Sequence, residues 1–347
     1  EYQYEKIQYD VIRVVVLLPG FEADPIRCQV RTVPRKRSTP YTAVSYTWAT
    51  EKGDATKSQC IYIHSEENLN TWAFISVTVN CENALRQLRD VLTHNVVWVD
   101  SVCVNQKDVA EVNDQVSAMV ETYICATNTA ICLNTPGKDF VEAIKLFISE
   151  PDIAKQTERS GQLDLACRPA LVQLAHLFEL RYFQRVWVVQ EVVLADKVLL
   201  YIDGAVVPFE KRTLRYMNAL CSRAQISIPL LSHWSSVYTG VTKDGGLDMV
   251  SILKMSMQCS ASDPRDRVFA TTGFLRSSVR AVIPVDYSLS LEHVLAYAAS
   301  ACIRCRGDLE ILRYAKLPLN ASVVAASSFG IEQFEDFIAR TKPREGH

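Results

Sequence analysis

The sequence predicts an α/β protein built on a doubly wound, mainly parallel sheet, with an N-terminal β-hairpin and a C-terminal helical appendage. Short β-branched runs alternate with segments whose apolar residues recur at helical spacing, and beyond about Phe209 the pattern is mainly helical. Strands that alternate with helices favour right-handed crossovers, which place parallel strands side by side with helices on both faces. We therefore expect an α/β domain at residues 1–208 and a mainly helical extension at residues 209–347 that packs on it.

The composition is that of an ordinary globular protein. The 347 residues are 48% hydrophobic and 22% charged, which suffices for a large core. A formal net charge of -2 gives no basic surface for a phosphate backbone, so we expect no nucleic-acid partner. The apolar run Val11–Leu18 contains Arg13 and is shorter than the roughly 20 residues of a membrane helix, so we expect no membrane span.

Cysteine usage predicts the compartment. The eleven cysteines are mostly scattered singly, without the spacing of a disulfide framework. That usage is typical of reduced thiols in the cytoplasm, where we expect the protein to reside. Cys302 and Cys305 form the one close pair, and zinc would lack half of its ligands there, so we expect no metal.

The N-terminal part predicts two hairpins around a single strand. The β-branched runs Val11–Leu18 and Ile26–Val33 are separated by two proline-containing turns and predict the first hairpin. Tyr41–Trp48 is a short β-prone run that ends in a polar loop. The runs Cys60–Ile63 and Trp72–Val79 predict the second hairpin.

Helices and strands then alternate. We expect a helix from a cap at Asn80 to Leu92, a strand at Val96–Asp100, a helix from Glu111 to Ala126 and a strand at Ala130–Leu133. The remaining segments expected are helices at Phe140–Ile148, Pro169–Leu180 and Tyr182–Ala195, a strand at Val198–Ile202, and helices at Leu214–Arg223, Met249–Met257, Arg267–Phe274 and Leu291–Arg304.

Widely shared catalytic signatures are missing from the sequence. It contains no G-x-S-x-G elbow, no G-x-x-x-x-G-K-[ST] phosphate loop, no G-x-G-x-x-G and no H-E-x-x-H. The six histidines are isolated from one another, and we expect none of them to act in catalysis.

Polar residues instead gather at predicted strand ends and helix starts, where open parallel sheets bind their ligands. Three segments qualify: Ser45 to Trp48, Asp100 with Asn105 to Asp108, and Arg185 to Glu191. Asp100 is placed either to orient a ribose hydroxyl or to cap the next turn. Asp108 is placed as a helix start signal, which is a structural role.

The third segment has helical spacing that places an indole beside a carboxylate. Trp187 and Glu191 are four residues apart and share a helix face, and Gln190 is three residues from Trp187. Such a pair suits a cationic aromatic substrate, because the ring stacks and the carboxylate stabilises positive charge. The alternative is a structural helix in which Trp187 packs inward and Glu191 pairs with Arg185 or Arg181.

At these same residues the sequence resembles the fungal heterokaryon-incompatibility (HET) domain family. The resemblance rests on several motifs in the family's order, and it covers most of residues 9 to 310. The motifs are Tyr41–Trp48, Val79–Arg89, Trp98–Gln106, Gln115–Ala126, Arg185–Val192, Asp263–Phe269 and Pro284–Ser288.

The resemblance implies a role in fungal non-self recognition and regulated cell death. The HET fold is similar to flavodoxin-like Toll/interleukin-1 receptor (TIR) domains, some of which cleave NAD. By that similarity Glu191 is the expected catalytic residue, NAD is a possible substrate and no cofactor is needed. The expected substrate-binding residues are Ser45, Tyr46 and Asp100 for ribose or phosphate, Trp48 or Trp187 for stacking, Arg185 for the pyrophosphate, and Gln190.

The sequence departs from the family pattern at Ala49, where the family usually has Gly. The added methyl group narrows close backbone approach and disfavours positive φ. We expect self-association as the switch for activity. Two alternatives stay open: a non-enzymatic module that signals by oligomerising, and a small-molecule tailoring enzyme with an apolar pocket lined by Tyr182, Phe183, Trp234 and Tyr238.

Overall fold

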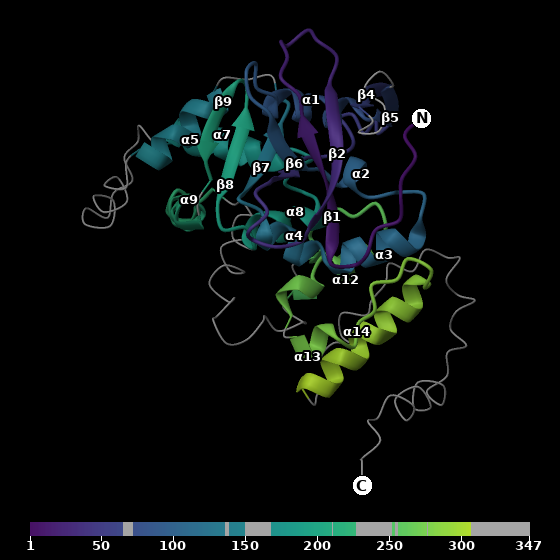
Figure 1. The fold of residues 1–347 in the computed structure, drawn as a ribbon. Coiled ribbons are helices and arrows are strands. Elements are labelled where there is room, and N and C mark those ends of the chain that lie inside the picture. Colours follow the sequence, from purple (N-terminus) through teal and green to yellow (C-terminus); the bar gives the residue numbers. More distant parts are fainter. Residues whose placement is uncertain are drawn as a thin grey trace.

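The computed structural model describes residues 1–64, 72–135, 139–149, 168–209, 211–226, 252–253, 256–275 and 277–306. Within them the chain forms a nine-stranded sheet with the order β5-β4-β2-β1-β6-β3-β7-β8-β9 (Figure 1). The strands are β1 Val11–Leu17, β2 Arg27–Pro34, β3 Thr42–Ser45, β4 Gln59–His64, β5 Trp72–Val77, β6 Asn95–Trp98, β7 Asn128–Leu133, β8 Val198–Ile202 and β9 Ala205–Pro208. The predicted α/β class is confirmed.

The sheet is mixed. At its centre β6, β3, β7 and β8 are parallel neighbours. Antiparallel pairs join β1 to β2, β1 to β6, β4 to β5 and β8 to β9, so both predicted hairpins are present. The expected mainly parallel sheet is too simple a description, because hairpin strands enlarge the parallel centre on both sides. The sequence pattern missed β9, a four-residue strand that ends in Pro208.

Most helices follow the predicted positions with different limits, but the short helices at Asp100–Cys103 and Ser277–Arg280 were not predicted. The helices are α1 Val79–Leu88, α2 Asp100–Cys103, α3 Val109–Ser117, α4 Met119–Cys125, α5 Asp139–Ser149, α7 Arg168–Glu179, α8 Val186–Val193, α9 Lys211–Arg223, α12 Asp266–Phe269, the 3-10 turn η2 Thr272–Phe274, α13 Ser277–Arg280 and α14 Leu291–Arg306. The predicted helix at Met249–Met257 lies mostly outside the described residues.

Two helix limits differ from the prediction for local reasons. The cap of α1 is Thr78, whose hydroxyl accepts from the Cys81 N–H at 3.2 Å, and the helix ends at Leu88. Asn80 lies inside α1, and its side chain instead donates to the carbonyls of Thr47 and Ala49. The predicted helix from Glu111 to Ala126 is divided into α3 and α4 at Ala118.

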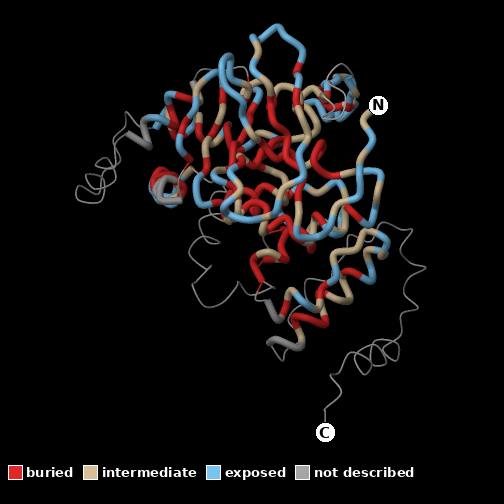
Figure 2. Tube along the Cα trace, in the orientation of Figure 1, coloured by how far each residue is buried: buried red, intermediate tan, exposed pale blue. Residues whose placement is uncertain are grey.

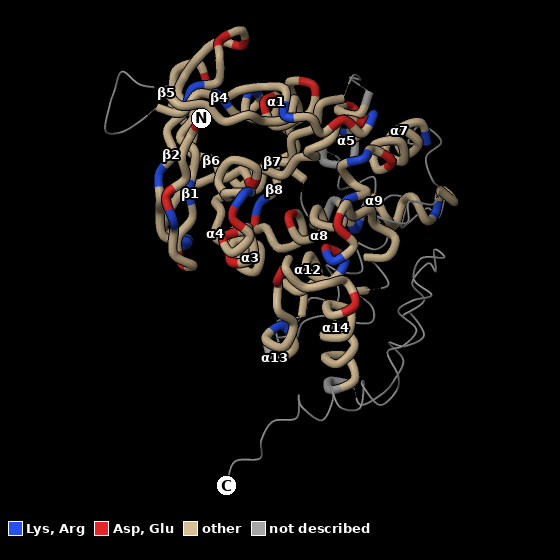
Figure 3. Tube along the Cα trace, turned by 90° about the vertical axis from the view of Figure 1, so that its right-hand side faces the viewer, with Lys and Arg blue, Asp and Glu red and all other residues tan. Residues whose placement is uncertain are grey.

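The helices lie on two sides of the sheet. In Figure 3, α1, α5 and α7 lie above the central strands, whereas α3, α4 and α8 lie below them, with α12, α13 and α14 further below. Buried residues run through the strands and the helices directly beneath them, as Figure 2 shows. No helix within the described ranges is long and apolar enough to cross a membrane.

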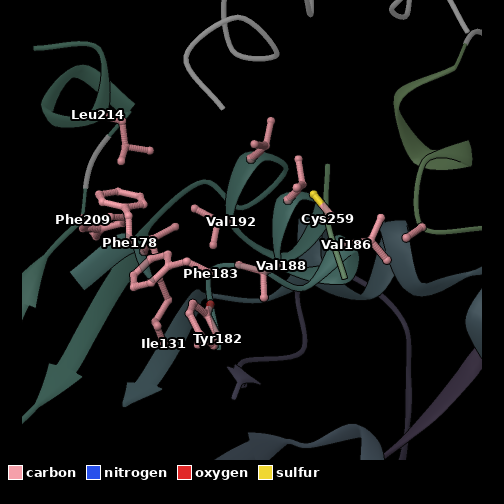
Figure 4. Packing of buried hydrophobic residues seen from close by; sticks show 14 of the residues in the cluster. Ile131, Phe178, Tyr182, Phe183, Val186, Val188, Val192, Phe209, Leu214 and Cys259 are labelled. Carbon is pink, nitrogen blue, oxygen red and sulfur yellow. The ribbon is translucent and has the colours of Figure 1, made fainter. Parts of the chain in front are cut away.

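Two hydrophobic clusters meet at β7. Ile131 and Leu133 belong to one cluster, whereas Ala130 and Cys132 belong to the other. Because alternate side chains of a strand point to opposite faces, β7 separates the two clusters. The first cluster includes α8 and the C-terminal helices α12 and α14. Figure 4 shows part of it, with Phe178, Phe183 and Phe209 beside Val192 of α8.

A buried ion pair explains the charged residue inside the first strand. Arg13 of β1 is 2% exposed and meets both carboxylate oxygens of Glu111, at 2.5 Å and 3.0 Å. It also donates to the carbonyls of Cys103 and Glu5. The second partner of Glu111 is the Asn105 N–H, at 2.7 Å. Arg13 therefore ties β1 to α2, α3 and the N-terminal segment.

Removing one partner of the Arg13–Glu111 ion pair should destabilise the fold. Glu111→Ala should lower the free energy of unfolding by about 3–5 kcal/mol, because it leaves the guanidinium of Arg13 buried without its counter-charge. Urea unfolding followed by circular dichroism measures the loss. Asp196→Ala is the control, since its pair with Arg37 is more than half exposed, at 60% and 62%, and its removal should leave the urea midpoint nearly unchanged. Equal shifts for the two variants would contradict this account.

Candidate functional site

The predicted site segments meet at one edge of the sheet. Ser45 is the last residue of β3, and Asp100 follows β6 directly as the first residue of α2. Since β3 and β6 are parallel neighbours, the segments that follow them leave the sheet at the same edge. A cleft of about 780 Å³ opens there. Its lining includes Trp48, Asp100, Arg185, Trp187, Glu191, Asp266 and Tyr287.

Glu191 is the buried acid of this cleft. Glu191 is 3% exposed, and its carboxylate accepts a hydrogen bond from the hydroxyl of Ser45. The Ser45 hydroxyl also lies 2.6 Å from the hydroxyl of Tyr182. Because Ser45 gives its one proton to Glu191, Tyr182 must donate to Ser45. The three groups form a directed chain from Tyr182 through Ser45 to Glu191.

Burial sets the protonation of Glu191. Removal from water raises the pKa of this carboxyl to about 7, against the charge of Arg185 and the hydrogen bond from Ser45, which both lower it. The neighbouring carboxylate of Asp100 adds to the rise. The acid therefore exchanges its proton near neutral pH, where catalytic acids and bases are commonly poised.

Arg185 is fixed at the start of α8. Its guanidinium donates to the carbonyl of Tyr46, and its own segment forms a bridge with Ser260, whose carbonyl accepts from the Val186 N–H at 3.0 Å. Among the described side chains, no ion pair within 4.0 Å joins Glu191 to Arg185 or Arg181. The structural alternative for Glu191, pairing with one of these arginines, is therefore absent from this part of the chain.

The carboxylate of Asp100 contacts the start of α2 and the loop after β3, and its role toward a ribose hydroxyl stays a prediction. One carboxylate oxygen accepts from the Ser101 N–H at 2.7 Å, and the other accepts from the indole N–H of Trp48 at 3.0 Å. Burial raises the pKa of Asp100, whereas the charge of Arg185 lowers it. The carboxylate holds the start of α2 and the orientation of the Trp48 ring, and it still lines the cleft.

Three predicted binding residues have side chains outside the cleft lining. The first is Ser45, whose buried hydroxyl contacts Tyr182 and Glu191. The hydroxyl of Tyr46 donates to Ser101 at 2.7 Å in the core, so this residue reaches the site through its backbone carbonyl. The Gln190 amide, in the orientation that satisfies it, donates to the Ala270 carbonyl at 3.0 Å and accepts from the Val120 N–H at 3.3 Å. Neither side chain is part of the described cleft lining. Gln190 therefore joins α8 to α4 and to the segment after α12.

The cleft also contains residues to which sequence analysis gave no chemistry. Tyr287 donates to a carboxylate oxygen of Asp266 at 2.7 Å, and both residues line the cleft. Asn113 of α3 fixes this wall, because it accepts from the Tyr287 N–H and donates to Asp286, each at 2.9 Å. Asp266 and Tyr287 lie in the motifs Asp263–Phe269 and Pro284–Ser288, which belong to the family resemblance. The resemblance could therefore have pointed to them, but it gave them no role.

Glu191 should make stability depend on pH. Its pKa is raised from 4.5 to about 7, so between these pH values the folded state binds more protons than the unfolded state. The free energy of unfolding should then fall as pH rises through this window, by roughly 3 kcal/mol for this group. Urea unfolding at pH 5 and pH 8 measures the fall, which Glu191→Gln should remove. Parallel pH dependences in wild type and variant would contradict the assignment.

Comparisons with known proteins agree with the motifs. The family model described as heterokaryon incompatibility protein (HET) matches residues 41–191. The chain is 24% identical over 377 residues to "Heterokaryon incompatibility protein 6, OR allele" of Neurospora crassa, with 88% of this chain and 54% of that protein covered. The chain thus spans about half the length of this relative. No solved structure matches the chain. These matches assign residues 41–191 of the chain to the HET-domain family.

Proposed function

We propose that this protein acts in fungal non-self recognition and regulated cell death, and that its cleft hydrolyses NAD at the bond between nicotinamide and ribose when the protein self-associates. The observation that carries the proposal is Glu191, a buried carboxyl that opens onto a cleft and titrates near neutral pH. The name of the Neurospora crassa relative, a heterokaryon incompatibility protein, supports the biological setting.

The order of the parallel strands supports a nucleotide site. In chain order β3, β6, β7 and β8 are the first to fourth parallel strands of the centre, and they lie side by side as 2-1-3-4. Flavodoxin-like doubly wound sheets, to which TIR domains are similar, have this order and bind their ligands at the strand ends where the order reverses. That position here lies between β3 and β7.

A second cavity supports a ligand with two halves. It has a volume of about 480 Å³ and is lined by residues that follow β3 and β7, including Asn134 and Thr135. Thr47 and Glu51 line both this cavity and the larger cleft, so the two adjoin. A dinucleotide has two nucleoside halves joined by a pyrophosphate, and adjoining cavities suit such a molecule.

The proposed role of Glu191 is electrostatic stabilisation of the transition state. When the bond between the nicotinamide nitrogen and ribose breaks, the nitrogen keeps the electron pair and nicotinamide leaves neutral. Positive charge then develops on the ribose, as in glycoside cleavage, and a nearby carboxylate stabilises it until water adds. The cationic substrate favours the ionised form of Glu191, and the Ser45 hydroxyl holds the carboxylate in place.

The loop with Ala49 is compatible with this proposal. Its carbonyl and that of Thr47 accept hydrogen bonds from Asn80 at 2.9 Å and 3.0 Å, which fixes the loop beside the cleft. Among the described residues other than glycine, positive φ occurs at Asp203 and Gln225, so the backbone at Ala49 does not require glycine. The methyl group faces no conformational penalty of that kind.

Two other functions compete with this proposal. A non-enzymatic module that signals by oligomerising would use Glu191 as an ion-pair partner, and the described arginines beside it form no such pair. A tailoring enzyme with an apolar pocket would need uncharged walls, whereas Asp100, Arg185 and Glu191 line this cleft. Tyr182 lines the second cavity, Phe183 is buried in the core, and Trp234 and Tyr238 lie outside the described residues.

We also propose a cytoplasmic location and one folding unit. Seven described cysteines are free thiols, as expected in a reducing compartment: Cys28, Cys60, Cys81, Cys103, Cys125, Cys132 and Cys221. The helical residues from 209 onward are proposed as an extension of the HET α/β domain, because α12 and α14 pack in the same cluster as α8.

Replacing Glu191 tests the catalytic proposal. Purified protein, alone and concentrated with a crowding agent, should release nicotinamide from NAD, and Glu191→Gln should lower the rate by at least about 100-fold, the usual cost of losing one transition-state contact. Chromatography of nicotinamide and ADP-ribose measures both products. Glu142→Gln is the control, because this exposed residue of α5 pairs with Lys145 on the surface.

The outcomes separate the candidate functions. No turnover by wild type in any state, together with concentration-dependent assembly in sedimentation experiments, would favour the oligomerising module. Equal turnover by wild type and Glu191→Gln would remove Glu191 from the reaction.

The pH profile tests the role of Ser45. If the ionised carboxylate acts, the rate should rise with pH to a midpoint near 7, the pKa of Glu191. Ser45→Ala removes a hydrogen bond that lowers this pKa, so the midpoint should move to higher pH. Ser101→Ala is the matched control, because it removes a buried hydroxyl that contacts Tyr46 instead of Glu191. An unchanged midpoint in Ser45→Ala would count against this role.

A further inference from the structure

One wall of the cleft comes from beyond the matched HET segment. The family model matches residues 41–191, yet Ser260, Asp266 and Tyr287 also line the cleft. This downstream wall is anchored to the HET domain at two places. Ser260 bridges Arg185 at the start of α8, and Asn113 of α3 holds the backbone of Tyr287. The cleft is therefore completed by residues to which the family match gives no role.

Asp266 is the acid of this downstream wall. It accepts a hydrogen bond from the hydroxyl of Tyr287 at 2.7 Å. Burial raises the pKa of Asp266, whereas the Tyr287 hydroxyl and the Trp187 indole both lower it. Both partners are neutral donors, so they orient the carboxylate without cancelling its charge. The indole of Trp187 thus lies near enough to act on the carboxyl of Asp266, and both residues line the cleft.

The neighbouring Arg265 forms its ion pair with Asp263, although the charge of Asp266 also acts on it. Arg265 is bound to Asp263 at 2.6 Å and donates to the carbonyls of Tyr287 and Leu289, each at 2.7 Å. The charge of Arg185 acts on Asp266, but it acts on Asp100 and Glu191 as well. One guanidinium is thus shared among three carboxyl groups.

The described lining as a whole has an excess of acids. Its acidic residues are Glu51, Asp100, Glu179, Glu191 and Asp266, and its basic residues are Arg181 and Arg185. Such a surface attracts cations and repels anions except at the two arginines. An aromatic ring in the same wall adds attraction for a positive charge held over its face.

We propose that Asp266, together with the indole of Trp187, forms a cation-selective subsite that binds a planar, positively charged heteroaromatic ring and makes Asp266 a specificity-determining residue. This proposal rests on the proposed function, in which that ring is the pyridinium of NAD. It adds that the site distinguishes the cationic pyridinium from a neutral ring of the same shape. The anionic part of a dinucleotide then lies toward Arg181 and Arg185.

Binding of two small rings tests the subsite without any cleavage. N-methylnicotinamide carries a pyridinium charge and has no ribose bond, whereas nicotinamide is its neutral counterpart. Isothermal titration calorimetry of the full chain at low salt should show wild type binding the cation at least about tenfold more tightly than the neutral ring, equivalent to about 1.4 kcal/mol. Added salt should weaken binding of the cation and leave that of the neutral ring unchanged.

Asp266→Asn should remove most of this preference and leave affinity for nicotinamide within about twofold, since the amide keeps the shape and loses the charge. Asp286→Asn is the matched control. Asp286 is in the same wall, is partly buried and lies outside the cleft lining, and asparagine keeps the oxygen that accepts from Asn113 and Ser288. The control should retain the full preference for the cation.

Several results would overturn the proposal. These are equal affinity of wild type for the two rings, failure of wild type to bind the cation, or an unchanged preference in Asp266→Asn. The comparison within wild type, with its salt dependence, stands even if Asp266→Asn fails to fold. If the preference for the cation is absent, NAD cleavage through Glu191 can still be measured. If cleavage is absent, the binding preference can still be measured, so each proposal can be disproved without the other.

Discussion

The hydrogen bond between Ser45 and Glu191 is the contact on which the site depends. It joins the end of β3 to the middle of α8, two segments that are 146 residues apart in the chain. The hydroxyl of Tyr182, which lines the second cavity, is hydrogen-bonded to Ser45. Arg185 donates a hydrogen bond to the carbonyl of Tyr46, one residue beyond Ser45. The strand end and the helix start are therefore held together by polar contacts, while the Val side chains of α8 fill the core.

The two buried glutamates, Glu111 and Glu191, differ in how well their charges are compensated. Glu111 has the guanidinium of Arg13 on both oxygens and a backbone N–H besides, which is a fully compensated structural ion pair. Glu191 has a hydroxyl and a more distant arginine. Burying a carboxyl with so little compensation destabilises the fold, and such groups are commonly kept where function requires a shifted pKa. Glu191 is open to the cleft, which fits that explanation.

The sequence predicted those parts of the fold that depend on local patterns. Alternating β-branched runs identified both hairpins, and the spacing of Trp187 and Glu191 predicted their shared helix face, which both residues use to line the cleft. The limits of α1 were wrong because Thr78 competes with Asn80 for the cap, and the choice depends on where Asn80 can donate instead.

Long-range contacts were beyond local patterns. Helical spacing says which side chains lie together, but it does not say that Gln190 meets Ala270 and Val120 in the interior. Similarly, no spacing brings Asp266 beside Trp187, because that contact depends on a wall that returns to α3 through Asn113. The mixed sheet was not predicted for the same reason, because strand order is decided by packing between distant segments. The short edge strand β9 was missed because four residues carry little sequence pattern.

The central claim is that Glu191 is a buried acid facing a cleft that accepts a cation. Its most direct test is a titration of carboxyl-labelled glutamate by nuclear magnetic resonance, with the Glu191 signal assigned by its absence in Glu191→Gln. The account predicts a pKa of about 7 for this one carboxyl, which moves downward when N-methylnicotinamide is added. A pKa close to 4.5 that does not respond to the cation would contradict the buried site and the function proposed for it.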